Sequence, residues 1–161
     1  MSIILGIDPW TTTTWFAIIR KKWNNAELLD YWIIDTPPNI PIEEKLFEIW
    51  NDINEIISTY NPDLAVIEKL FFTNNIKTWI DVSHARWVVL YCLYSKGIQM
   101  KHYTPLELKS AICGNWKATK KQLQNAIKMI LNMETTPKPD DAADAIWLAY
   151  LWSLLKKDLD F

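Results

Sequence analysis

The sequence predicts an α/β fold in which helices flank a mixed β-sheet. Short apolar runs at residues 3–7 and 64–67 are bounded by turn signals, as expected of strands covered on both faces. Residues 11–20 and 27–35 alternate and are rich in β-branched side chains, and the polar turn KKWNN joins them into a hairpin. Apolar residues recur at helical spacing elsewhere. The order of three strands, a helix, a strand, a helix, a strand and further helices predicts a layered α/β domain.

The remaining elements follow from spacing, capping and helix-breaking residues. Apolar positions from Ile42 to Ile57 predict a helix after the break TPPNIP. Lys96 and Gly97 end a second helix, as a basic last turn followed by a glycine cap. Thr119 is a candidate N-cap for the helix that contains Leu123. The other predicted elements are a helix at 75–95, a strand at 98–103, a short helix at 105–114, a helix with Leu123, Ala126, Ile127, Ile130 and Leu131 on its buried face, and a last helix that begins near Asp140.

Length and composition indicate one soluble domain over residues 1–161. No targeting segment begins the chain, and its longest apolar runs are shorter than the roughly 18 residues of a membrane span. We therefore expect a cytoplasmic protein without a membrane partner. Cys92 and Cys113 lack CxxC spacing, so we expect buried thiols and neither a zinc site nor a redox pair.

The charge balance limits how this chain can bind nucleic acid. A net charge of -2 excludes nonspecific binding of a polyanion by the whole surface. The densest basic stretch is KATKK at 117–121, with Lys109 and the RKK stretch at 20–22 as further cations. Each of these lysines, taken alone, is also compatible with an ordinary solvated surface. A nucleic-acid site would therefore be local.

Four carboxylates stand out by their context. Asp8 and Glu68 follow the two most apolar strands, and Asp141 and Asp144 are three residues apart, on one face of the last helix. If the two strands are neighbours and the last helix crosses them, the four groups converge. Their mutual repulsion would then favour bound divalent cations. Oxygen ligands without His or Cys suit Mg²⁺ or Mn²⁺, and two such ions about 4 Å apart can promote phosphodiester displacement.

Each acid also has a structural explanation. Helix-dipole complementarity accounts for Asp141 and Asp144, and turn formation before Pro9 accounts for Asp8. Glu68 directly follows LAVI, where a charge without a partner or a metal would be costly. Asp140 competes with Asp141 for the same role, and spacing alone does not choose between them.

Several ordered motifs resemble the RuvC Holliday-junction resolvases. They are ILGIDP with TTTT, AVIEKLFFTNNIKT, SHAR, YTPLELKSAICGN, KATKKQ and PKPDDAADAI, and they cover nearly the whole chain. The resemblance implies a ribonuclease H-like three-layer fold with a five-stranded mixed sheet. It also implies a homodimer that makes Mg²⁺-dependent, symmetrical nicks in four-way junction DNA during recombination and repair, with Mn²⁺ as a possible substitute. A branch-migration motor complex is a further candidate partner.

The resemblance also assigns residues. Asp8, Glu68, Asp141 and Asp144 become the catalytic metal ligands, and Lys109 and Lys120 the basic groups near the scissile phosphate. The helix that contains SHARWVVLYCLY resembles the dimer helix. Phe71 resembles an aromatic residue that stacks on bases at the opened junction, although it also fits a core position at a strand end. The assigned DNA-binding residues are Phe71, Lys117, Lys120 and Lys121.

Tryptophan stands where the resemblance leads us to expect glycine, as at Trp10, Trp15, Trp87 and Trp116, and Trp23 lies in a turn. The chain has 10 Trp and 3 Gly; with glycine at all ten positions, the glycine content would match the usual roughly 7%. One explanation is a UGA codon that the organism translates as glycine. The alternative is that the indoles are real and either crowd the site or stack on bases.

Two other functions compete with junction cleavage. If the indoles block catalysis, the protein could bind junctions without cutting them. GIDPWTTTT also resembles the first phosphate loop of actin-like phosphotransferases. That class needs a second phosphate motif and about twice this length, and the chain has neither.

Overall fold

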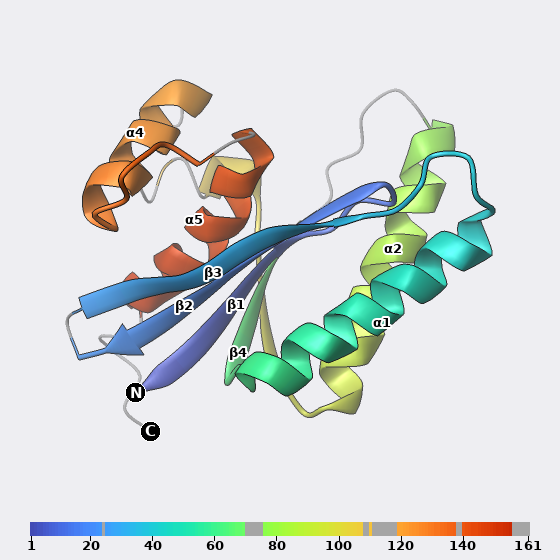
Figure 1. The fold of residues 1–161 in the computed structure, drawn as a ribbon, viewed down its shortest axis with the longest axis horizontal. Helices are drawn as coiled ribbons and strands as arrows, with labels where there is room; N and C mark the ends of the chain where they lie inside the picture. Colours follow the sequence, from blue (N-terminus) through green and yellow to red (C-terminus); the bar gives the residue numbers. More distant parts are fainter. Residues whose placement is uncertain (24, 70–75, 108–109, 111–118, 138–139, 156–161) are drawn as a thin grey trace.

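A five-stranded sheet lies between two layers of helices (Figure 1). The computed structural model describes residues 1–23, 25–69, 76–107, 110, 119–137 and 140–155. The strands are β1 (Ser2–Asp8), β2 (Thr13–Lys22), β3 (Asn25–Asp35), β4 (Leu64–Glu68) and β5 (Gln99–Tyr103). The predicted α/β fold with a five-stranded mixed sheet is therefore confirmed.

The strand order is β3-β2-β1-β4-β5. β1 pairs antiparallel with β2, and β2 pairs antiparallel with β3, as the predicted hairpin requires. β1 pairs parallel with β4, and β4 pairs parallel with β5. The two most apolar strands of the sequence are therefore neighbours at the centre of the sheet, and their carboxyl ends lie at the same edge.

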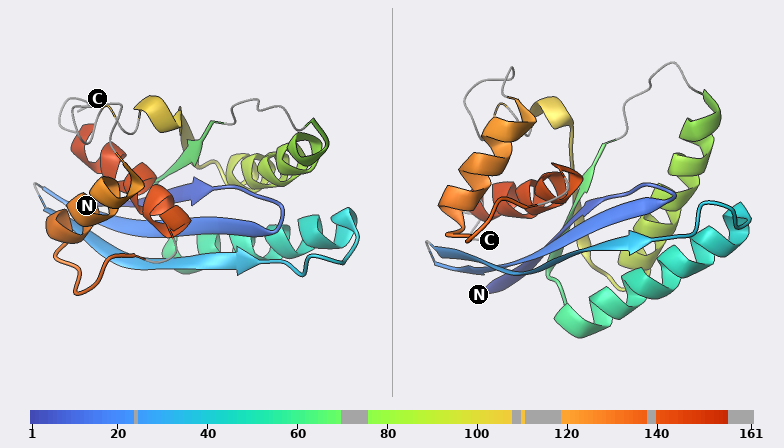
Figure 2. Two further views of the ribbon diagram at one scale, coloured as in Figure 1. Left: turned by 90° about the horizontal axis from the view of Figure 1, so that it is seen from above. Right: turned by 45° about the horizontal axis from the view of Figure 1, so that its top comes forward.

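Helices cover both faces of this sheet. α1 (Ile42–Tyr60) and α2 (Ile76–Ser95) pack on one face, and α4 (Lys120–Ile130) and α5 (Asp140–Leu155) lie on the other (Figure 2). α5 contacts β1, β2, β3 and β4, whereas α4 packs against α5. α2 corresponds to the helix predicted at 75–95, and Asn75 lies outside the described residues.

Alternation of side chains along the strands divides the core in two. Ile4 and Val66 point toward α5 and pack with Ile146. Ile7 and Ile67 point the other way and pack with residues of α1 and α2. This period of two is the ordinary consequence of strand geometry, and it explains why β1 and β4 are apolar at every position before their terminal acids.

Capping groups fix the helix ends that the sequence indicated. The side chain of Thr119 accepts a hydrogen bond from the backbone N–H of Gln122, and the two residues form a capping box at the start of α4. Thr104 and Glu107 make the same reciprocal contacts at 2.7 and 3.1 Å where the predicted short helix begins. Gly97 follows α2 with a φ of 70°, as expected of a glycine cap.

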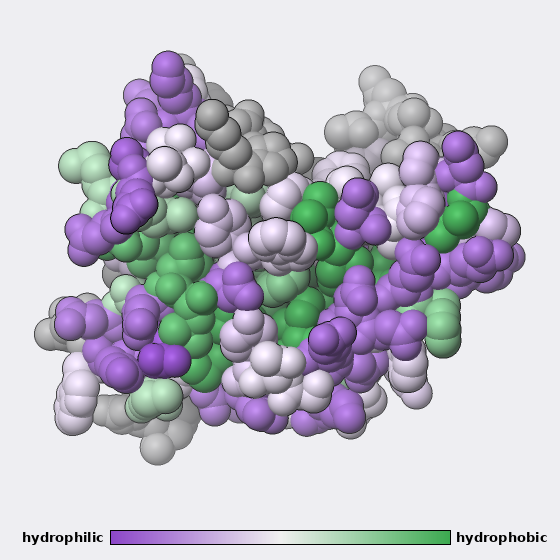
Figure 3. All heavy atoms as spheres, in the orientation of Figure 1, coloured by the Kyte–Doolittle hydropathy of each residue, from purple (hydrophilic) through white to green (hydrophobic). Residues whose placement is uncertain are grey.

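The surface is polar over the outer face of α1, and apolar side chains gather where the sheet lies between that helix and the α4–α5 layer (Figure 3).

Among the described helices, none is long and apolar enough to cross a membrane. Cys92 is buried and free, and burial raises the pKa of its thiol. Cys113 lies outside the described residues.

Trp23 has a backbone conformation that suits glycine. Its φ is 51°, in the left-handed region, and its side chain is 96% exposed at the β2–β3 turn. A residue with a Cβ costs about 1–2 kcal/mol in that region, and an exposed indole offsets little of this cost. The geometry at Trp23 therefore supports the hypothesis that glycine serves at this position in the organism.

We expect Trp23→Gly to raise the free energy of unfolding by about 1 kcal/mol, because glycine adopts this φ without steric cost. Trp32→Gly is the matched control. Trp32 is also exposed, but it lies within β3, where glycine should lower stability by about 1 kcal/mol. Urea unfolding of both variants measures the two effects, and a destabilised Trp23→Gly protein would contradict the glycine hypothesis. Recoding has its own direct tests. The intact mass of the protein from its own host distinguishes glycine from tryptophan, and UGG codons at the ten positions would exclude recoding.

Candidate active site

Two carboxylates end neighbouring parallel strands. Asp8 is the last residue of β1, and Glu68 is the last residue of β4. The register pairs Ile7 with Ile67, so the two acids directly follow one pair of partners. Hydrophobic pairing of the strands therefore brings together two charges that are 60 residues apart in the chain.

Both acids lie on the side of the sheet that α5 covers. Because side chains alternate between the two faces of a sheet, Asp8 points to the same face as Ile4, and Glu68 points to the same face as Val66. Ile4 and Val66 both pack in the core beneath α5. Tyr103 pairs with Glu68 from β5 and packs against the same core. Asp8 is 4% exposed, whereas Glu68 is half-buried.

Helix α5 approaches β1 at Gly6 with no side chain between the two backbones. A Cβ at Gly6 would collide with the carbonyl oxygen of Ala145 and lie 2.8 Å from the amide nitrogen of Ala149. Glycine and alanine together permit this contact. Gly6 is two residues before Asp8, and Ala145 directly follows Asp144. The contact therefore places the Asp144 turn of α5 next to the end of β1.

Asp144 is half-buried in α5, which begins at Asp140. Asp140 and Asp141 form the first turn of this helix, one turn before Asp144. The side chains of Asp140 and Asp141 lie outside the described residues, so the choice between them stays a prediction.

Two threonines hold the loop that follows Asp8. The buried Thr14 hydroxyl accepts a hydrogen bond from the Trp10 amide at 3.2 Å and donates to the Trp10 carbonyl at 2.7 Å. Thr36 donates to the Thr11 carbonyl at 2.7 Å and thereby ties the end of β3 to the same loop. The Trp10 indole N–H donates to Oδ1 of Asp8 at 3.0 Å. The Asp8 carboxylate thus lies next to a loop of defined conformation.

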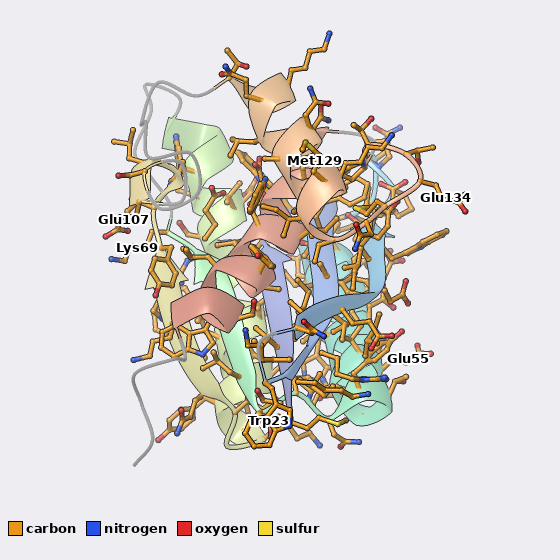
Figure 4. The ribbon with its side chains drawn as sticks, turned by 90° about the vertical axis from the view of Figure 1, so that its left-hand side faces the viewer. Trp23, Glu55, Lys69, Glu107, Met129 and Glu134 are labelled. Atoms are coloured by element: carbon orange, nitrogen blue, oxygen red, sulfur yellow. The ribbon has the colours of Figure 1, made fainter. Side chains whose placement is uncertain are left out.

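Beyond Glu68, the chain stays attached to β5. The Lys69 amide donates to the Tyr103 carbonyl at 2.7 Å. Figure 4 shows Lys69 and Glu107 at the same side of the molecule. Hydrogen bonds from the Thr104 amide and hydroxyl, and then the charge of Lys69, lower the pKa of Glu107. Burial, and then the nearby charge of Glu107, raises the pKa of Tyr103.

The donor set at this edge suits a hard cation. Asp8, Glu68 and Asp144 offer oxygen atoms only, and they come from three elements that meet on one side of the sheet. Within the described residues, no group of three or more His, Cys, Asp or Glu side chains is arranged so that it could hold a metal ion by itself. Mg²⁺ does not need one, because it is commonly bound by one or two carboxylates with water and substrate phosphate oxygens completing its shell. The residues present therefore fit such an ion.

Most of the basic residues and the aromatic residue that the sequence singles out cannot be placed. Phe71, Lys109 and Lys117 lie outside the described residues, and so does the side chain of Lys120. Lys121 is exposed in the first turn of α4. Because α4 packs on α5, Lys121 lies in the same layer as α5.

The sequence analysis assigned no role to Thr14, Thr36 or Arg86. Thr14 and Thr36 are buried polar residues at the loop after Asp8, and Arg86 contacts the backbone of Glu68. The signal at Arg86 was a lone cation in the apolar stretch ARWVVL, where a buried charge requires a partner. The threonines gave no comparable signal within the run TTTT.

The chain matches proteins of one family over most of its length. The family model of the crossover junction endodeoxyribonuclease RuvC matches residues 4–151. The crossover junction endodeoxyribonuclease RuvC of Petrotoga mobilis is 40% identical over 148 residues, which is 92% of this chain and 91% of that protein. The protein of the same name from Alkaliphilus metalliredigens is 42% identical over 147 residues, which is 91% of this chain and 90% of its own.

Solved structures agree with this match. The chain superimposes on T. thermophilus RuvC in complex with a Holliday junction substrate with a TM-score of 0.91, at 25% identity, over 98% of this chain and 96% of that one. Fowlpox virus resolvase, solved with substrate Holliday junction DNA, shares the fold with a TM-score of 0.58 at 21% identity, over 95% of this chain and 99% of that one. The ribonuclease H-like fold expected from the sequence is confirmed.

We expect Gly6→Ala to lower the free energy of unfolding by about 2–3 kcal/mol, because the added methyl group must push α5 away from β1. Gly97→Ala is the matched control, since nothing lies within 4 Å of its Cβ position and only its φ of 70° is unfavourable, at a cost of about 1 kcal/mol. Urea unfolding compares the two variants. Equal losses would contradict the direct backbone contact between α5 and β1.

Proposed function

The chain belongs to the RuvC family of crossover junction endodeoxyribonucleases, and on that premise we propose that it resolves four-way DNA junctions by cutting two strands symmetrically. The proposal draws its support from one observation above the others. The carboxyl ends of β1 and β4 lie side by side, and α5 is seated on β1 next to them. This arrangement gathers acids at a single edge, as metal-dependent phosphodiester hydrolysis requires.

In this proposal, Asp8, Glu68, Asp144 and Asp141 hold Mg²⁺, with two ions in each site and Mn²⁺ as a substitute. When bound by these residues, the ions would stabilise charge on the attacking and leaving oxygens of the phosphodiester. The carboxylates bind and orient the ions. Thr14 and Thr36 hold the loop after Asp8, so that this carboxylate need not reorganise during the reaction.

In this proposal, a few lysines supply the positive charge that binds the DNA. The net charge of the chain is -2, so its whole surface does not attract phosphates. Lys109 and Lys120 contact the scissile phosphate, and Lys117 and Lys121 bind the DNA backbone next to it. The placement of Lys121 at the start of α4, in the α5 layer, supports this assignment. Phe71 stacks on a base at the opened junction.

The outer face of α2 supports a homodimer. Val82, Ala85 and Val89 are buried against the core. On the opposite face an exposed stripe repeats at intervals of four and three residues, as in helices that pair with another helix. Its members are Ile80 (53% exposed), His84, Trp87 (70%), Tyr91 (65%) and Tyr94 (77%). A twofold dimer through this stripe provides the two equivalent sites that paired cuts in a nearly symmetric junction need.

One contact favours a second candidate function, junction binding without cleavage. The Trp10 indole, 39% exposed, donates a hydrogen bond to Asp8 and so lies against a proposed metal ligand. If this indole obstructs the ion, the protein binds junctions and does not cut them.

We further propose a cytoplasmic location and a branch-migration motor complex as a partner, since junction resolution follows branch migration.

We expect Asp8→Asn and Glu68→Gln each to reduce cleavage of a synthetic four-way junction in Mg²⁺ by about 100-fold or more, because each removes a metal-binding charge and keeps the side-chain shape. Junction binding in Ca²⁺ should change less than about 3-fold. Asp63→Asn is the matched control, because Asp63 lies just before the opposite end of β4 and its side chain accepts a hydrogen bond from Ile3. Cleavage by both variants at the wild-type rate would remove these acids from the mechanism. Wild-type binding without cleavage would favour the second candidate.

We expect Tyr91→Glu to weaken self-association by about 10-fold or more, because it buries a charge at the centre of the proposed interface. Phe47→Glu is the control, since Phe47 is 62% exposed on the neighbouring helix α1. Sedimentation equilibrium measures both dissociation constants. A monomeric wild-type protein at micromolar concentration, or equal effects of the two variants, would contradict the α2 dimer.

A further inference from the structure

Arg86 connects helix α2 to the strand end that carries Glu68. Its Nε–H donates to the backbone carbonyl of Glu68 at 3.4 Å. Its terminal nitrogen lies 3.0 Å from Nδ1 of His102 on β5. Because a guanidinium can only donate, Nδ1 of His102 accepts, and the ring proton lies on Nε2. One side chain therefore binds the ends of two adjacent strands.

The electrostatics around this pair support the neutral imidazole that such a contact requires. Burial, and then the charges of Arg86 and Lys69, lower the pKa of His102. Burial also lowers the pKa of Arg86, but an arginine keeps its charge at any ordinary pH. A charged donor held against two neutral acceptors makes stronger hydrogen bonds than a neutral donor would.

The position of the contact explains why a side chain is used here. The pairing of β1 with β4 ends at Ile7 and Ile67, and Pro9 follows Asp8. Proline has no N–H, so it cannot donate a backbone hydrogen bond to this end of β4. The Arg86 guanidinium supplies a donor to the Glu68 carbonyl from the opposite face of the sheet.

We propose that Arg86 is a positioning residue for Glu68: its guanidinium holds the backbone of the metal-binding residue against α2 and fixes where the carboxylate points on the α5 side of the sheet. The inference rests on the proposed function, because it gives Glu68 the role of a metal ligand. It also means that the helix carrying the proposed dimer stripe bears directly on the site, since Arg86 and the exposed Trp87 are adjacent residues of α2.

The test is Mn²⁺ binding to the purified protein, measured by isothermal titration, alongside cleavage. We expect Arg86→Met to weaken Mn²⁺ binding about 10-fold, because partners that orient a metal ligand typically contribute 10–100-fold in affinity. The cleavage rate at saturating junction should fall at least as much, and the junction dissociation constant in Ca²⁺ should stay unchanged. Arg20→Met is the matched control, because Arg20 pairs with the exposed Glu27 on the β2–β3 hairpin.

Rescue separates positioning from a general loss of stability. Arg86 lines a hollow of about 350 Å³ with Lys69, Ser83, Trp87 and Leu90, which gives small molecules access to its place. Free guanidinium at millimolar concentration should therefore restore part of the Mn²⁺ affinity that Arg86→Ala loses, and it should leave the Mn²⁺ affinity of Arg20→Met unchanged. Urea unfolding in the absence of metal gives the folded fraction of each variant, so that binding is compared between folded proteins.

The outcomes distinguish the two proposals. Wild-type Mn²⁺ affinity in folded Arg86→Met would overturn the positioning role and leave the proposed function intact. A wild-type protein that binds Mn²⁺ and does not cut a junction would overturn the proposed function alone, and the difference between Arg86→Met and wild type in Mn²⁺ affinity would still decide the role of Arg86. A wild-type protein that binds no Mn²⁺ would overturn both.

Discussion

The contact between α5 and β1 at Gly6 is the constraint on which the site depends. An α-helix normally packs on a sheet through side chains that fill the space between the two backbones. Here the Ala145 carbonyl and the Ala149 amide rest directly on the strand backbone. The close approach lowers the Asp144 turn toward the sheet surface, where Asp8 lies two residues farther along β1. A residue larger than glycine at position 6 would push this turn of α5, and Asp144 with it, away from Asp8.

The opposite face of the sheet contributes as well. The side chain of Glu68 points toward α5, and its carbonyl is bound by Arg86 from α2. Asp8 is held differently, through the loop that Thr14 and Thr36 fasten. Two carboxylates on adjacent strands are thus fixed by separate sets of contacts, one to a side chain of α2 and one within the loop after β1. A metal ion that binds both would find their spacing already set, which reduces the ordering that binding must accomplish.

The sequence predicted the sheet well because its signals are local and strong. Apolar runs followed by Asp8 and Glu68 identified two central strands, and Thr119 identified a helix start that the capping box confirms. The sequence did not predict that β1 pairs with β4. We assumed this pairing, because strand order depends on packing far from either segment. The role of Arg86 could not be predicted, since it depends on which face of α2 turns toward β4 and on the missing donor at Pro9.

The tryptophans show where local geometry and sequence disagree. Trp23 occupies a left-handed turn position with its indole in solvent, and the buried indole nitrogen of Trp147 has no hydrogen-bond partner among the described residues. Both features cost stability, and glycine at position 23 would remove the first, whereas Trp147 fills the core beneath α5 and glycine there would leave a cavity. At Trp10 the consequence is chemical, because the indole N–H shares Oδ1 of Asp8 with any ion that binds there. Glycine at this position would leave the oxygen to the metal and keep the Thr14 hydrogen bonds, which involve only the backbone of residue 10. The loop that presents Asp8 therefore needs the backbone at position 10 and gains nothing for metal binding from the indole.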